Sequence, residues 1–345
     1  MKKNLTILFL FVSSFIFSQS LSDLVFGGEG SFEVVTWNLQ FFPKNNQTTI
    51  DSTKLSMLAL NADVYALQEI NDVDAFQDLA NSLEDYMGYI IPNNYNNLKL
   101  AYLVHKDVEV ISHNSILNSN QYSYNFAGRP PYLIELSFSG LTFYIINIHL
   151  KCCGDGILDE LDSEDQETRR KAAINAIKYY IDNNLSDKNV LVVGDYNDLI
   201  EDDISNNVFQ SFLDDSDNYL FADTPILDFP TYLWSYPTWP SHLDHILITN
   251  ELFDEFNNAY NYVTTINMAQ YFSNGFEGYD NCISDHLPVG IRLWPITSNI
   301  DDKKIKPKHI KEIINIEGKN VKPSSNQLQF LIYDNGSVEK KITLD

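Results

Sequence analysis

Short apolar segments that each end in a polar side chain recur along this chain. The clearest covers residues 189–198, NVLVVGDYND, in which four apolar residues precede Gly194, Asp195 and Asn197. A run of this length, rich in β-branched residues, is typical of a strand buried on both faces. Because side chains alternate along a strand, Asp195 and Asn197 are predicted to share one side. Taken alone, the residues are explained as well by an Asx turn after a buried strand.

Five further segments repeat this pattern. The polar groups at their ends are Asn38 in SFEVVTWNLQFF, Glu69 in ADVYALQEI, His149 in LTFYIINIHL, Asp244 in HLDHILIT, and Asp285 with His286 before LPVGIRLW. Taken one at a time, these residues have simpler explanations: Asn38 as a turn former, Glu69 as a solvated acid and His149 as a core histidine. An acid inside a run of Leu and Ile, as at Asp244, is costly to bury without a partner. As a series, they predict strand ends that converge at one rim.

The intervening segments predict helices and further strands. Helices are expected over residues 51–61, 72–85 and 168–184, where apolar residues recur at helical spacing. Residues 99–111 predict a hairpin that turns near Lys106 and Asp107. The aromatic residues of 232–239 either line a pocket or cover the core, and core cover is the simpler interpretation.

The polar groups at the strand ends form a chemically coherent set. Carboxylates such as Glu69 and Asp285 are hard oxygen ligands suited to Mg²⁺, Mn²⁺ or Ca²⁺. A buried Asp244 beside His286 fixes the imidazole's tautomer, and Asp195 can orient or deprotonate a water. The chain has no GxSxG elbow and no P-loop. These features predict direct attack by water on a metal-bound phosphate ester.

Charge and the N-terminus limit the class of protein. There are 23 basic and 47 acidic residues, a formal net charge of −24, which excludes a broad basic surface for nucleic acid. Bound cations must therefore offset the charge of a phosphodiester. Residues 1–19, MKKNLTILFLFVSSFIFSQ, have the layout of a secretory signal peptide. We therefore expect a secreted or cell-surface protein, and a monomer.

Three cysteines and an acidic stretch lie outside this pattern. An odd number of cysteines in an exported chain predicts at most one disulfide, and Cys152 or Cys153 is expected to pair with Cys282. Residues 152–167, CCGDGILDELDSEDQE, are rich in carboxylates whose spacing does not match an EF-hand loop. A solvated loop and a calcium site both remain open there.

Six sequence blocks together resemble a known superfamily. They are TWNLQ, LQEI, NIHL, GDYND, HLDHIL and SDHLPV, in this order between Ser31 and Trp294. They resemble the endonuclease/exonuclease/phosphatase superfamily, which shares the pancreatic deoxyribonuclease fold. The resemblance implies an α+β fold over residues 20–297, a four-layer α/β/β/α sandwich of two mixed β-sheets. It also implies a phosphodiester hydrolase that depends on a divalent metal, Mg²⁺ or Mn²⁺, with Ca²⁺ as a further alternative.

The resemblance assigns a role to each matching residue. The implied metal ligands are Asn38, Glu69 and Asp285. The implied catalytic residues are His149, which faces the leaving group, Asp195, which positions the attacking water, Asn197, which holds the phosphate, and the pair of Asp244 and His286. Arg129, in GRPP, matches an arginine near the substrate phosphate. The implied substrate-binding residues are therefore Arg129 and Asn197. Tyr102 is a candidate for the tyrosine that contacts phosphate.

Three functions are compatible with these residues. The first is a secreted nuclease that cleaves nucleic acid. The second is a phosphodiesterase or phosphatase on a small or lipid substrate, such as a sphingomyelinase-like enzyme. The third is an inactive binding module on the same scaffold.

The C-terminal residues resemble a different kind of domain. After a charged linker at residues 298–309, the β-leaning tail at residues 310–345 includes GKNVKPSSNQLQFLIYDNGSVEKK. This tail resembles the C-terminal sorting domain of type IX secretion cargo in Bacteroidetes. The resemblance implies that the secretion machinery reads the tail as an address.

Overall fold

The computed structural model describes Leu21, Leu24 and residues 26–91, 98–258, 260–295, 310–315, 319–322, 328–333 and 338–342. The predicted signal peptide and charged linker lie outside these residues. The chain forms two compact units, Met1–Ile296 and Thr297–Asp345. Within the described part of the chain, no helix has the length and apolar character needed to cross a membrane.

The first unit contains two six-stranded sheets. Sheet A has the order β11 (Tyr262–Thr265), β12 (Val289–Leu293), β1 (Phe32–Phe42), β2 (Val64–Ile70), β4 (Lys99–His105), β3 (Tyr86–Ile90). Sheet B has the order β5 (Glu109–Ser115), β6 (Tyr132–Phe138), β7 (Leu141–His149), β8 (Asn189–Asp195), β10 (Asp244–Thr249), β9 (Tyr219–Phe221). In each sheet one central pair is parallel, β1 with β2 and β7 with β8, and the other pairs are antiparallel. Both sheets are therefore mixed.

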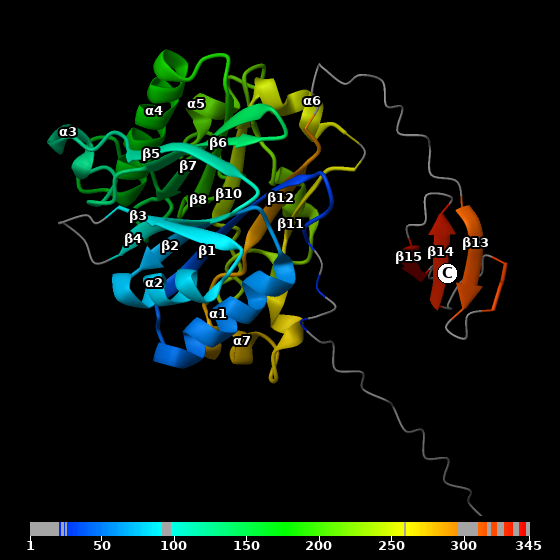
Figure 1. Cartoon of the computed structure of the whole chain (residues 1–345). Coiled ribbons are helices and arrows are strands. Elements are labelled where there is room, and N and C mark those ends of the chain that lie inside the picture. Colours follow the sequence, from blue (N-terminus) through cyan, green and yellow to red (C-terminus); the bar gives the residue numbers. More distant parts are fainter. Residues whose placement is uncertain are drawn as a thin grey trace, which may run out of the picture. The chain divides into compact units, whose positions relative to one another are not determined.

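Helices cover the outer faces of the two sheets (Figure 1). The helices against sheet A are α1 (Asn46–Leu60), α2 (Val73–Ser82) and α7 (Phe276–Cys282), and those against sheet B are α4 (Gln166–Asn184) and the short α5 (Gln210–Leu213). Two more short helices are α3 (Asn120–Ser123) and α6 (Phe253–Phe256). The predicted four-layer α+β sandwich is confirmed.

Alternation along the strands builds this sandwich. Val34 and Val64 pack between the sheets, whereas their neighbours Val35 and Tyr65 pack outward against the helical layer. All four are completely buried, which explains why these strands read as continuous apolar runs. Full burial of an aliphatic side chain such as Val34 contributes roughly 1.5–3 kcal/mol. Each of these apolar strands therefore contributes side chains to two cores, one between the sheets and one between sheet A and its helices.

The strand ends that carry polar residues meet at one rim. His149 at the end of β7 pairs in register with Asp195 at the end of parallel β8. Asp244 begins antiparallel β10 and also pairs with Asp195. In sheet A, Asn38 on β1 pairs with Gln68 on β2, one residue before Glu69. The sequence thus predicted the convergence, although Asp244 stands at the start of its strand.

The backbone of sheet A is irregular where it reaches this rim. The register of β1 with β2 shifts between Asn38 and Phe42, and that of β2 with β4 shifts between Leu67 and Ile70. Glu69 has a φ of 61°. Positive φ is unfavourable for a residue with a Cβ, and such strain concentrates at functional sites. The bulges aim the Glu69 carboxylate out of the sheet.

Two sequence expectations are wrong in the first unit. Residues 99–111 do not form a hairpin, because β4 belongs to sheet A and β5 to sheet B. The predicted disulfide is also not formed, since all three cysteines are free. Cys282 packs on the outer core of sheet A, whereas Cys152 and Cys153 follow β7 of sheet B, with their two Sγ atoms 3.0 Å apart.

The second unit contains an antiparallel three-stranded sheet. Its strands are β13 (Ile310–Asn315), β14 (Leu328–Tyr333) and β15 (Val338–Ile342). The β character expected for the tail is therefore present in its described residues.

Candidate active site

Asn38, Glu69 and Asp195 form the centre of the site. Asn38 Nδ2 donates to Asp195 Oδ2 at 2.9 Å and lies 3.4 Å from Glu69 Oε1. The Phe41 backbone N–H donates to Glu69 Oε2 at 2.9 Å, and the Gln40 N–H donates to Asn38 Oδ1 at 2.9 Å. The Asn38 amide therefore links carboxylates from the two sheets, and the backbone of the β1 bulge holds Asn38 itself and Glu69.

His149 joins this centre from β7. Its Nε2 lies 3.5 Å from Asp195 Oδ2 and 3.8 Å from Glu69 Oε1. Burial lowers the pKa of His149 well below 6.5, and Arg129 and His286 lower it further. A neutral His149 can donate a hydrogen bond without adding charge. Its Nδ1 is buried without a partner among the described residues.

Arg129 lies behind this histidine. Its Nε donates to the His149 carbonyl at 3.0 Å and its Nη2 to the Leu150 carbonyl at 2.6 Å. Arg129 is 7% exposed. Two of its donors are thus used to fix the end of β7, so the role of Arg129 at a substrate phosphate remains a prediction.

Asp244 and His286 form a buried pair next to Asp195. His286 Nδ1 lies 2.7 Å from Asp244 Oδ2. Burial alone lowers the pKa of an imidazole, but the Asp244 carboxylate raises the pKa of His286 from 6.5 to about 10. His286 is therefore a cation at neutral pH, and its orientation is set by the aspartate as in a catalytic triad.

The pKa of Asp195 is far above that of an ordinary aspartate. Burial raises its pKa from 3.8 to about 7, with Asp244 and Glu69 adding to the rise and His286 and Asn38 opposing it. Carboxylates poised near neutral pH are suited to general acid–base chemistry. Asp195 is 1% exposed and accepts the Asn197 backbone N–H at 3.0 Å.

Asn197 and Asp285 complete the set at the edge of the site. Asn197 has a φ of 54°, and its Nδ2 lies 3.3 Å from the Leu150 carbonyl. The Asp285 backbone N–H donates to Gln40 Oε1 at 3.2 Å. Burial raises the pKa of Asp285, and the nearby Glu69 carboxylate contributes to the rise. The predicted residues are thus assembled around one centre, while their individual roles remain predictions.

A buried network that sequence reasoning missed supports Asp244. Ser235 Oγ accepts the Asp244 N–H at 3.0 Å, and the Ser235 N–H donates to His242 Nδ1 at 3.4 Å. His242 Nε2 and His245 Nδ1 lie 2.9 and 2.7 Å from Asp223 Oδ2. His245 Nε2 lies 2.9 Å from the Asp198 carbonyl. Every imidazole nitrogen is hydrogen-bonded, so this cluster positions Asp244 and leaves no nitrogen free for a metal. Both histidines lie in the segment SHLDHIL, whose apolar residues predict a buried strand, so nothing in the sequence marks these histidines as part of a site.

Several aromatic side chains beside the site face solvent. Phe41 is 56% exposed, and its own backbone N–H donates to Glu69. Trp239 is 75% exposed in the turn between the paired residues Tyr236 and Ser241, and the Tyr236 ring lies 4.9 Å from that of His286. Core cover is therefore the wrong interpretation for Trp239. Trp234, by contrast, packs against the core between the sheets.

Tyr102 is not part of the site. It is fully buried between the sheets, and its hydroxyl lies 2.7 and 2.9 Å from the Tyr132 and Ile145 carbonyls. A hydroxyl already bound to two carbonyl groups inside the core cannot reach substrate.

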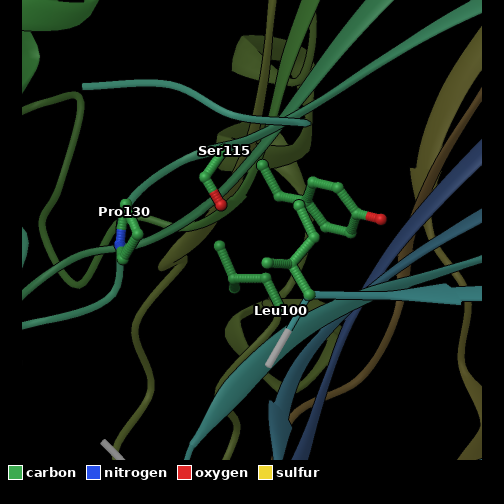
Figure 2. A pocket seen from close by; sticks show the side chains of 5 residues that line it. Leu100, Ser115 and Pro130 are labelled. Atoms are coloured by element: carbon green, nitrogen blue, oxygen red, sulfur yellow. The ribbon is translucent and has the colours of Figure 1, made fainter. Parts of the chain in front are cut away.

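A small pocket near Arg129 is likewise not the substrate site. Figure 2 shows Leu100, Ser115 and Pro130 around it, and Ile91 and Tyr132 complete the lining. Its volume of about 10 Å³ is room for roughly one water molecule. The chemistry at the rim therefore does not take place in this pocket.

The donor set of the site fits a divalent cation. Four carboxylates, those of Glu69, Asp195, Asp244 and Asp285, interact electrostatically with one another and with two cations, the His286 imidazolium and the Arg129 guanidinium. Lys44 lowers the pKa of Asp285, but its ammonium also pairs with Asp280 at 2.6 Å and so is shared between the two carboxylates. Across the ranges that the structure describes, no backbone N–H donates to Glu69 Oε1. The carboxylates of Glu69 and Asp285 are the hard ligands that Mg²⁺ and Mn²⁺ prefer. Asn38 turns its nitrogen toward Glu69, so its ligand role remains a prediction.

Comparison with protein families decides the classification. The endonuclease/exonuclease/phosphatase family matches residues 35–286, a range that includes every side chain of the site from Asn38 to His286. The chain belongs to the endonuclease/exonuclease/phosphatase family. No curated protein sequence matches the chain.

Solved structures of this family share the fold. The zebrafish (D. rerio) TDP2 complexed with a single-stranded DNA product has a TM-score of 0.58 and 14% identity, covering 77% of this chain and 99% of that one. The catalytic domain of human nocturnin with a bound sulfate has a TM-score of 0.51 and 17% identity, covering 76% and 94%. A family protein from Bacteroides thetaiotaomicron has a TM-score of 0.53 and 13% identity, covering 76% and 97%.

Proposed function

We propose that this protein is an exported, divalent-metal-dependent phosphodiester hydrolase whose substrate is nucleic acid. The observation that carries the proposal is the convergence of Glu69, Asp195 and His286 at one rim. Asp195 titrates near neutral pH, and an imidazolium paired with Asp244 lies beside it. These are the parts needed to activate water and to stabilise an anionic transition state.

Asp195 acts on the attacking water. Its carboxylate accepts the proton of the water as the oxygen approaches phosphorus, while Asn38 Nδ2 holds Oδ2 in place. His286 donates from its Nε2 side to a phosphoryl oxygen, since its Nδ1 is held by Asp244. The bond between phosphorus and the leaving oxygen breaks as the new bond to the water oxygen forms, and the leaving oxygen takes its proton from solvent. Asn197 and neutral His149 donate hydrogen bonds to the remaining phosphoryl oxygen and to the leaving oxygen. A divalent ion held by Glu69 and Asp285 would neutralise charge on the phosphoryl group.

The aromatic residues at the rim support nucleic acid as the substrate. The strongly acidic chain cannot hold a polyanion through phosphate contacts alone. Stacking of bases on exposed aromatic rings is an alternative source of affinity, worth about 1–3 kcal/mol per base. Trp239 and Phe41 are exposed beside the site and available for such stacking. The DNA product bound to the zebrafish relative agrees with this choice.

A substrate panel tests the proposal. Purified protein is incubated with single- and double-stranded DNA, RNA, sphingomyelin vesicles and a phosphate monoester, in Mg²⁺, in Mn²⁺ and in EDTA. We expect cleavage of DNA or RNA with Mg²⁺ or Mn²⁺ and none in EDTA. Hydrolysis of sphingomyelin or of the monoester alone contradicts the substrate assignment. No hydrolysis of any substrate by folded protein supports an inactive binding module instead.

Trp239→Ala is expected to weaken substrate binding without affecting the chemical step. Loss of one stacked base should raise KM for a single-stranded oligonucleotide by about 5- to 150-fold, whereas kcat on a dinucleotide too short to reach Trp239 should not change. Tyr179→Ala, at a ring that is 64% exposed on α4 and therefore on the outer helical layer, is the matched control. Equal effects of the two substitutions, or no effect of either, would argue against stacking at Trp239.

Export is the remaining part of the proposal. Residues 1–19 have the layout of a signal peptide, and the three-stranded sheet of the second unit is compatible with a sorting domain. Deleting residues 310–345 should retain the protein inside a type IX secreting host, whereas the full-length chain appears outside. Equal amounts of both proteins in the medium would contradict the role of the tail.

A further inference from the structure

The loop between β7 and α4 contains an acidic cluster apart from the active site. One carboxylate oxygen each from Asp155, Asp165 and Glu167 lies within 4.8 Å of the others. We propose that these three residues bind a Ca²⁺ ion that fixes the loop against the neighbouring end of β8. This site would be distinct from the metal site at Glu69.

Glu167 contributes to this cluster a buried carboxylate with one unsatisfied oxygen. The residue is 1% exposed, and its Oε1 accepts the Gly156 N–H at 2.8 Å and lies 3.1 Å from Arg170 Nη2. Its Oε2 is buried with no hydrogen-bond partner in the described part of the chain. A buried polar atom without a partner is costly, more so on a charged group. A cation bound to Oε2 removes this cost.

Asp165 faces Glu167 closely enough that the two carboxyl groups interact directly. Asp165 Oδ2 accepts the Thr168 N–H at 2.7 Å and so caps the first turn of α4. Burial raises the pKa of Glu167, and contact with Asp165 raises it further. Two facing carboxylates need either a cation or a shared proton between them. The position of Asp155 near both favours the cation, since a shared proton uses only two of the three groups.

The geometry and the ligand types favour Ca²⁺. Two oxygens on one Ca²⁺ ion, each at 2.3–2.6 Å, are at most about 5 Å apart. The three carboxylates meet this limit. All three ligands are oxygens, which suits a hard cation. Asp155 is exposed while Glu167 is buried, so the ion has a path from solvent and room for water ligands. An irregular loop accommodates Ca²⁺ more readily than Mg²⁺, which requires near-octahedral geometry.

A glycine allows the loop to wrap around Glu167. Gly154 has a φ of 116°, and a Cβ at this position would lie 2.0 Å from Glu167 Oε1. Only glycine permits this approach of the backbone to the carboxylate. The Glu167 carboxylate is therefore enclosed by backbone on one side and turned toward Asp155 and Asp165 on the other.

Arg170 connects the proposed ion to the rim. Its Nη1 donates to the Lys151 and Cys153 carbonyls at 2.8 and 2.7 Å, and its Nε donates to Asp198 Oδ2 at 2.6 Å. Asp198 follows Asn197 directly. An ion that fixes Glu167 therefore also fixes Arg170 and the chain at the end of β8. We expect the ion to raise stability and to protect this loop from proteolysis.

The test is Ca²⁺ binding by metal-free protein, measured by isothermal titration and by the Ca²⁺-dependent rise in Tm at constant ionic strength. Glu167→Gln and Asp155→Asn should abolish one binding event and the Tm rise. Two controls should keep both: Asp162→Asn, an exposed acid of the same loop, and Glu69→Gln at the active site. Because Asp155 is exposed, its substitution should not prevent folding if Glu167→Gln does.

Three results would overturn the proposal. Wild-type protein could fail to bind Ca²⁺, which would assign a shared proton to Glu167 and Asp165. The Tm rise could be lost in Glu69→Gln and kept in Asp155→Asn, which would place the ion at the active site. Equal loss in Asp162→Asn would indicate general screening of charge. None of these results depends on hydrolytic activity, so they are separate from the test of the proposed function.

Discussion

Asp195→Asn should lower kcat on a nucleic acid substrate by about 10²- to 10⁴-fold, the usual contribution of a general base. The amide keeps the shape of the carboxylate but cannot accept a proton from water. Binding of substrate and of Mg²⁺ should change little, since Glu69 and Asp285 remain. Single-turnover cleavage, together with oligonucleotide binding measured without turnover, checks both expectations.

The same variant carries its own stability control. The pKa of Asp195 is raised from 3.8 to about 7 in the folded protein, so folding favours its protonated form. Its contribution to stability is fully present below pH 3.8 and is lost as pH rises through 7. Asp195→Asn should therefore be at least as stable as wild type, with a Tm advantage that grows between pH 4 and 7. A large loss of Tm would attribute lost activity to unfolding, and full activity would exclude Asp195 as the base.

Asp244→Asn should move the alkaline limit of activity toward neutral pH. In the wild type, the pKa of His286 is raised to about 10, so its positive charge is present below that pH and lost above it. Without the Asp244 charge, the pKa of His286 should fall to about its usual 6.5, since burial lowers it while Asp195 and Asp285 still raise it. At pH 8 only about 3% of such imidazoles are protonated, so kcat/KM should fall at least roughly 30-fold.

The pH profile separates this effect from simple damage to the fold. Activity of Asp244→Asn relative to wild type should recover as pH falls below 6.5, because both proteins then carry the His286 proton. Removing one partner of a buried pair also costs stability, about 3–5 kcal/mol, so Tm must be followed in parallel. A constant ratio of activities between pH 6 and 9 would show that the charge on His286 is not what Asp244 supplies.

The sequence predicted the sandwich and the rim because both follow from local patterns. Val34 and Val64 belong to apolar runs that only a strand buried on both faces explains. The polar residues after these runs were predicted at strand ends. His149 and Asp195 end their strands and Glu69 is the last but one residue of β2, whereas Asn38 lies four residues before the end of β1. The positions of these ends at one rim depend on the parallel pairs β1 with β2 and β7 with β8.

Long-range contacts explain what the sequence could not predict. The turn at Lys106 and Asp107 looks like a hairpin locally, but its strands enter different sheets. The cysteines are close in sequence to residues of one rim, yet they lie in different layers. His242 and His245 look like core residues, and only the hydrogen bonds from His242 through Ser235 to Asp244, and from His245 to the Asp198 carbonyl, connect them with the site. Tyr102 is by resemblance a candidate for the tyrosine that contacts phosphate in the family, but its hydroxyl is bound to two carbonyl groups inside the core.

The central claim is that Glu69 holds a divalent ion at the rim where Asp195 activates water. A titration of nucleic acid cleavage with Mg²⁺, run side by side for wild type, Glu69→Gln and Glu167→Gln, tests it most directly. We predict no cleavage in EDTA, a Mg²⁺ requirement at least about tenfold higher for Glu69→Gln, and an unchanged requirement for Glu167→Gln. Cleavage by the wild type in EDTA, or identical Mg²⁺ curves for wild type and Glu69→Gln, would contradict the account.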